Sequence, residues 1–166
     1  MSNGTSGDVK CSPADPAPPY VRMREVANGV AEETVRVCRQ MPYHNWLPLA
    51  VRTVELELGV RRPNAERLAW ARAVAATAKG GARNSRPEIY AREAVLLAEY
   101  PPTMPIKLQA FRIGDLGIAA APCEVFAETG LAIKKDSPLK ATFTISLANG
   151  YGGYLPTPEQ HGWGGY

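Results

Sequence analysis

The chain of 166 residues is 45% hydrophobic and 21% charged, a composition that predicts one soluble globular domain with a buried core. Its net charge of +3 comes from 19 basic and 16 acidic residues spread along the sequence, with no dense basic block or zinc-finger pattern. Nucleic acid is therefore not an expected partner. The three cysteines, Cys11, Cys38 and Cys123, lack a Cys-x-x-Cys spacing and predict neither a disulfide framework nor a cysteine zinc site.

Both ends of the sequence have the character of cuts through a longer protein. Residues 1–20 are rich in proline and are predicted to form a loop that carries the motif "NGTSGDV". They lack the pattern of a signal peptide, and no apolar run approaches the roughly 20 residues of a membrane span, so no transmembrane segment is expected. The ending "HGWGGY" is expected to stop in a loop. The location of the parent stays open, with a secreted or periplasmic protein as one option.

Helical and strand patterns follow in turn after the proline-rich start. Residues 21–40 place valines near helical spacing among charged residues and predict an amphipathic helix. Residues 46–60 alternate apolar and polar side chains and predict a half-buried strand. The remaining expected elements are helices over 63–81, ended by Gly80-Gly81, over 86–100, capped by Asn84 or Ser85, and over 124–137, and strands over 105–114, 116–122 and 140–149.

The order of these elements predicts the fold class. Gly114-Asp115 separates two strands and is typical of a tight hairpin. The succession of strand, hairpin, strand, helix and strand indicates an α/β layered fold with a mixed β-sheet and packed helices. Residues 21–166 are thus expected to be part of a single α/β domain, itself a fragment of a larger catalytic domain.

Two strand ends carry unusual chemistry. Pro122-Cys123-Glu124 follows one strand, and the glycine- and tyrosine-rich loop from Asn149 to Tyr154 follows another. Ligands of α/β sheets bind outside the carboxyl ends of strands. If the two strands are neighbours, Glu124 and Tyr154 are expected to converge on one point, with the glycines allowing the backbone to fold close to it.

These segments resemble a known family. "AAAPCEVFAETGLAIK", followed about thirty residues later by "ISLANGYGGYLPTPEQHGWGGY", is similar to the carboxyl half of the zinc-dependent domain of neutral/alkaline non-lysosomal ceramidases. Those enzymes are amidases that cleave the N-acyl bond of ceramide. The early "NGTSGDV" also resembles that family's Asn-x-Gly-Asp-Val-Ser-Pro motif, so the resemblance touches both ends of the chain in the right order.

The resemblance implies a metal site and roles for particular residues. Glu124 and Tyr154 would be ligands of a Zn2+ ion, with two further histidine ligands supplied upstream of this sequence. Tyr166, twelve residues beyond Tyr154, would assist at the reacting carbonyl, and Tyr151 and Asp8 would contact substrate. The implied reaction is cleavage of an amide bond in a small molecule or a lipid such as ceramide, by water that zinc activates.

One position departs from the family pattern. The serine proposed as nucleophile should follow Gly-Asp-Val, but Lys10 follows Val9 here, and the next serine is Ser12. Either Ser12 takes the role through a longer loop, or the chain is a relative without that serine and with a different substrate. We favour the second interpretation.

Structural roles compete with each functional one. Without the resemblance, Glu124 would be interpreted as a carboxylate that favours the first turn of a helix, and the tyrosines as aromatic residues of surface loops. His44 is interpreted as a residue that packs or bonds locally, and His161 as part of the rim of a pocket. Two alternatives also stay open for the chain as a whole. It is a noncatalytic binding module or inactive relative, or it is a fragment that has no activity without its parent.

Overall fold

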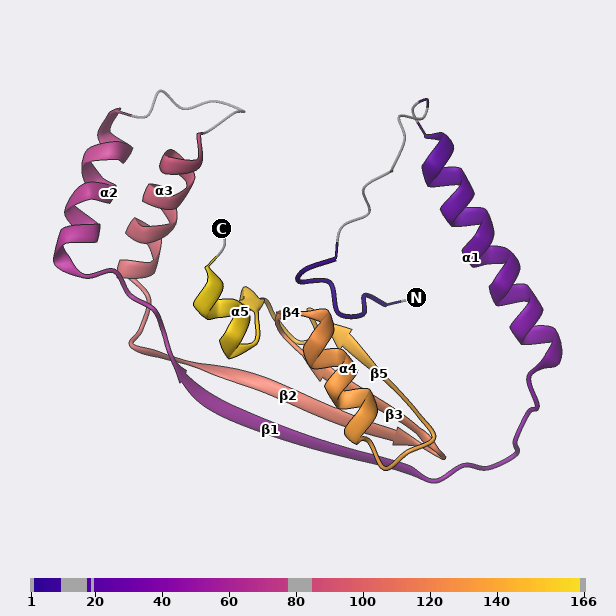
Figure 1. The fold of residues 1–166 in the computed structure, drawn as a ribbon. Coiled ribbons are helices and arrows are strands. Elements are labelled where there is room, and N and C mark those ends of the chain that lie inside the picture. Colours follow the sequence, from indigo (N-terminus) through magenta and orange to yellow (C-terminus); the bar gives the residue numbers. More distant parts are fainter. Residues whose placement is uncertain (1, 10–17, 19, 78–84, 165–166) are drawn as a thin grey trace. The chain divides into compact units, whose positions relative to one another are not determined.

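The computed structural model describes residues 2–9, 18, 20–77 and 85–164, which form helices and strands of an α/β fold (Figure 1). The chain divides into two compact units. The first comprises Met1–Thr53 with Leu108–Tyr166, and the second comprises Val54–Lys107. The elements are α1 (Val21–Gln40), β1 (Leu49–Gly59), α2 (Ala65–Thr77), α3 (Arg86–Ala98), β2 (Thr103–Ile113), β3 (Leu116–Ala121), β4 (Glu124–Val125), α4 (Ala127–Asp136), β5 (Ala141–Ser146), β6 (Tyr154–Leu155) and α5 (Pro158–Trp163).

The main sheet is mixed. Its strand order is β1-β2-β3-β5, while β4 and β6 form a separate two-stranded sheet. β2 and β3 are antiparallel, with Ile113 opposite Leu116. Between them Gly114 has a φ of 60°, a left-handed conformation that glycine adopts without steric cost. The hairpin predicted at Gly114-Asp115 is therefore confirmed.

β5 runs parallel to β3, and α4 connects the two strands and packs against β5 (Figure 1). In this register Ala119 lies beside Thr144 and Ala121 beside Ser146. Both hydroxyl residues are buried. The predicted α/β fold with a mixed sheet is confirmed, and the carboxyl ends of β3 and β5 lie side by side.

The second unit holds a helical hairpin. α2 and α3 pack through a seam of alanines, flanked by partly buried larger side chains: Ala71, Ala91 and Ala94, with Trp70, Val74 and Val95. Ser85 precedes α3 at the cap position, and its backbone N–H donates to Glu88 Oε2 at 2.6 Å. This is one half of a capping box, so Ser85 is confirmed as the cap. Asn84 and the stop at Gly80-Gly81 lie outside the described residues.

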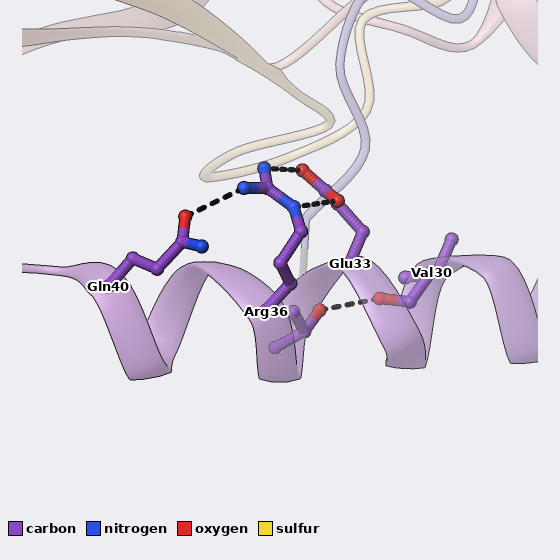
Figure 2. Close-up of polar contacts among 5 residues, drawn as sticks. Val30, Glu33, Arg36 and Gln40 are labelled. Carbon is purple, nitrogen blue, oxygen red and sulfur yellow. Dashed lines mark hydrogen bonds and ion pairs between the residues drawn. The ribbon is translucent and has the colours of Figure 1, made fainter.

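α1 confirms the first predicted helix, and none of its residues is buried. The Arg36 guanidinium donates to both carboxylate oxygens of Glu33 and to Gln40 Oε1, the last at 2.9 Å (Figure 2). The ion pair lowers the pKa of Glu33 and raises that of Arg36. Because the pair is exposed, it contributes little to stability.

Three expectations about local structure were wrong. The strand expected over 46–60 is present as β1, but it is exposed along its whole length and not half-buried. The helix expected over 124–137 begins only at Ala127, because the Glu124 and Phe126 amides donate to Gly153 O and Leu155 O, which makes Glu124–Val125 a strand. The interpretation of Glu124 as a residue of the first helical turn is therefore also wrong. The ending "HGWGGY" was expected to be a loop, but α5 extends through Trp163. α5 begins at Thr157, whose hydroxyl accepts from the Gln160 amide.

Candidate functional site

Glu124 and Tyr154 are directly paired across the two-stranded sheet of β4 and β6. The two strands are parallel, and side chains of residues paired in this way project to the same face. β4 follows β3 closely, and β6 follows the loop after β5. The predicted convergence of the two residues at neighbouring strand ends is therefore confirmed for their backbone positions.

The loop before Tyr154 is folded back onto the connection between β3 and β4. Ala148 N–H donates to Ala121 O at 2.9 Å, and Glu124 N–H donates to Gly153 O at 2.8 Å. Four loop residues have positive φ angles: Leu147 (61°), Asn149 (68°), Gly150 (149°) and Gly153 (81°). Glycine and asparagine tolerate such conformations better than other residues. This backbone path explains why the strand ends in a glycine-rich sequence.

The Tyr154 ring is held on one side and accessible on another. It meets the Phe126 ring edge to face, with centroids 6.5 Å apart and an interplanar angle of 87°. This is a favourable aromatic geometry. Tyr154 is 41% exposed, and Glu124 is half-buried. A carboxylate residue and a phenol residue therefore occupy adjacent positions at a partly open surface.

The amino-terminal segment of residues 2–9 packs beside this pair. Ser146 N–H donates to Asn3 O at 3.2 Å, and Gly7 N–H donates to Val125 O at 3.0 Å. A Cβ atom at Gly7 would lie 2.6 Å from Phe126 Cδ1 and closer still to the Glu124 carbonyl oxygen. Only glycine fits this approach, so the "NGTSGDV" motif lies directly against the backbone of β4.

Asp8 caps a helix from a distant point of the chain. Its Oδ1 accepts a hydrogen bond of 2.8 Å from Ala127 N, the first amide of α4. The residue at the cap position itself is Phe126, which has no oxygen in its side chain. The Asp8 carboxylate takes that role and its charge favours the helix amino terminus. Its predicted contact with substrate stays a prediction.

Replacing Asp8 by alanine is expected to lower the free energy of unfolding by about 1 kcal/mol, the usual loss for a helix cap. Asp8→Asn should retain most of the stability, because an amide oxygen still accepts from Ala127 N. Denaturant unfolding of the three proteins measures the difference. Equal stability of Asp8→Ala and the unchanged protein would contradict the capping role.

The other candidate residues lie around or beyond this region. Tyr151 is in the loop after β5 and is 69% exposed. Ser12 and Tyr166 lie outside the described residues, so their roles stay predictions. His44 is exposed between α1 and β1, and His161 is exposed on α5.

Cys123 precedes Glu124 and is buried. Burial raises the pKa of its thiol above the ordinary value, because desolvation disfavours the thiolate. The group therefore stays protonated at neutral pH.

The chemistry of the pair suits zinc, but it supplies only part of a site. Zinc accepts carboxylate oxygens, and the field of a cation favours deprotonation of a bound phenol. Within the ranges that the structure describes, no three or more His, Cys, Asp or Glu side chains are grouped to hold a metal ion. Glu124 and Tyr154 would supply at most two oxygen ligands, and a four-coordinate zinc site needs two more.

Gln109, which the sequence patterns did not single out, links the loop after β5 to the main sheet through hydrogen bonds. Gln109 on β2 accepts from Asn149 Nδ2 at 2.9 Å and donates through Nε2 to Thr53 Oγ1 at 3.0 Å. Its one signal in the sequence is an amide within a largely apolar strand pattern. That signal does not reveal a partner 40 residues away.

The fold is that of an α/β protein with a mixed sheet, and it is similar to part of a known structure. That structure is the neutral ceramidase from Pseudomonas aeruginosa, with a TM-score of 0.59 and 15% sequence identity. The similarity covers 99% of this chain and 32% of the other, so this chain spans about a third of that length. No family model and no curated protein matches the sequence. Among the described residues, no helix has the length and apolar character needed to cross a membrane.

Proposed function

We propose that this chain forms part of a zinc-dependent hydrolase that cleaves an amide (N-acyl) bond of a lipid such as ceramide. One observation carries the proposal. Glu124 pairs directly with Tyr154 at the start of the parallel strands β4 and β6, which follow the parallel strands β3 and β5 in the chain. Support comes from the similarity of nearly the whole chain to part of a neutral ceramidase.

The residues of the pair have distinct tasks in this proposal. Bound zinc lowers the pKa of a water molecule to about 7 and polarises the carbonyl oxygen of the substrate. Glu124 would contribute a charged oxygen to the zinc ion, and Tyr154 would contribute a phenol oxygen, which the field of a cation makes a plausible ligand. Tyr166 donates a hydrogen bond to the developing oxyanion. With Lys10 at the position of the family's serine, water is the nucleophile.

Removal of the metal tests the reaction. The full gene product, treated with a chelator and checked by elemental analysis, is expected to lose hydrolysis of N-acylsphingosine and of a short-chain N-acyl amine. Added Zn2+ should restore the activity, and added Mg2+ should not, because Mg2+ prefers octahedral oxygen sites. Full activity of the metal-depleted protein would refute a zinc-dependent reaction.

A noncatalytic binding module or inactive relative of the same fold is the second candidate. It is favoured by the absence of a three-ligand group among the residues that the structure describes. Such a protein would bind the lipid amide without cleaving it and without stoichiometric zinc. Equilibrium binding of N-acylsphingosine vesicles, measured beside product formation and zinc content, separates the two candidates.

A further inference from the structure

We propose that Gln109 is a positioning residue that sets the loop after β5 and thereby the pairing of Glu124 with Tyr154. The expected effect on zinc binding rests on the proposed function, but the hydrogen bonds that support the inference lie within this chain. Asn149, Gln109 and Thr53 form a row of side-chain hydrogen bonds. The row runs from the loop to the edge strand β1 within one compact unit.

The two ends of the Gln109 amide are used differently. Its oxygen faces the Asn149 amide, and its nitrogen faces the Thr53 hydroxyl. A side-chain amide has one acceptor end and one donor end, so both bonds are satisfied in one orientation. Gln109 lies opposite Ala120 of β3, a small and buried side chain.

Asn149 lies at the start of the glycine-rich part of the loop after β5. The Ala148 amide makes a backbone bond to Ala121 O at the end of β3, and Asn149 then turns into a left-handed conformation. The following glycines include Gly150 and Gly153, both with positive φ. Because glycine restricts the backbone least, the hydrogen bond of the Asn149 side chain is the contact that fixes the start of this glycine-rich segment. Loss of the Asn149–Gln109 hydrogen bond would weaken the pairing of Tyr154 with Glu124.

The experiment uses Gln109→Ala, Asn149→Gly and the double variant in the full gene product. Asn149→Gly removes the side chain while glycine still adopts the positive φ. Gln109→Glu keeps an acceptor for Asn149 and serves as the conservative rescue. Gln40→Ala, on exposed α1, is the matched control for loss of a glutamine side chain.

Two readouts are measured. Zinc affinity comes from competition with a chromogenic chelator, and amide hydrogen exchange is followed in the zinc-free protein. Each single variant is expected to weaken zinc binding by at most about tenfold, the low end of the cost of losing a group bonded directly to a ligand, because Gln109 and Asn149 act only through the loop. The double variant should weaken it no more than either single variant. Exchange at the Glu124 and Phe126 amides should accelerate, since these bond to Gly153 O and Leu155 O. Exchange in β3, the thermal midpoint and the properties of Gln109→Glu should stay unchanged.

The outcomes separate the inference from the proposed function. If Gln109→Ala keeps normal zinc affinity and normal exchange at Glu124 and Phe126, the positioning role is overturned, whatever Glu124→Ala does to zinc. Faster exchange throughout β3 together with a lower thermal midpoint would also overturn it, because the role would then be general stability. If Glu124→Ala leaves zinc bound, the proposed function fails, while selective exchange at Glu124 and Phe126 still supports the positioning role.

Discussion

Replacing Glu124 by alanine in the full gene product is expected to reduce zinc affinity by more than about 100-fold. Loss of an outer-shell partner already costs roughly 10- to 100-fold, and a ligand costs more. The change removes the charged oxygen of the Glu124–Tyr154 pair but leaves the backbone bonds of β4 in place. Tyr154→Phe removes only the phenol oxygen and keeps a ring to pack against Phe126. It should weaken zinc binding in the same direction.

Matched substitutions at exposed positions control for the loss of each side-chain type. Glu159→Ala on α5 and Tyr100→Phe after α3 are expected to bind zinc as the unchanged protein does. Zinc affinity is measured by chelator competition, with the thermal midpoint of the zinc-free proteins as a check on folding. Unchanged zinc stoichiometry in both Glu124→Ala and Tyr154→Phe would refute the ligand assignment.

Gly7→Ala is expected to lower the free energy of unfolding by about 3 kcal/mol, the upper end of the usual overpacking cost. The added methyl group would meet the Glu124 carbonyl oxygen and the Phe126 ring. Moving the segment of residues 2–9 away from β4 would break the bond that Gly7 N–H donates to Val125 O. Displacement of the segment would also remove the Asp8 cap from α4.

Gly29→Ala is the control for this substitution. A Cβ at Gly29 meets no atom within 4 Å, and alanine is the better helix former, so α1 should be unaffected or stabilised. Denaturant unfolding of the full gene product measures both variants. A Gly7→Ala protein as stable as the unchanged one would show that the "NGTSGDV" segment does not pack against β4.

Local patterns predicted the parts of the fold that depend on neighbours in sequence. The hairpin at Gly114-Asp115 has a turn chemistry of its own, and Ser85 has the spacing of a capping box with Glu88. The mixed α/β class followed from the order of elements. The hairpin and the cap need only a few consecutive residues, and for that reason the sequence reveals them.

The parts that were missed depend on distant partners. β4 and β6 have two residues each, too few to show a strand period, and they exist because the chain pairs Glu124 with Tyr154. The Asp8 cap joins residues 119 positions apart. The helical periodicity that starts at Glu124 continues into α4, so it placed the helix start too early.

The candidate site was predicted in part. The convergence of Glu124 and Tyr154 followed from the rule that ligands bind at strand ends, and their pairing confirms it. Their role as zinc ligands rests on the family resemblance and stays a prediction. The sequence offered no means to find Gln109, because the fold alone brings its amide to Asn149.

Anomalous X-ray diffraction at the zinc edge, from crystals of the full gene product grown with zinc, tests the central claim most directly. We expect one zinc ion with a Glu124 carboxylate oxygen and the Tyr154 phenol oxygen at about 2.0–2.2 Å, and with two nitrogen ligands completing the site. A protein that binds no zinc, or a zinc ion whose ligands include neither residue, would contradict the account.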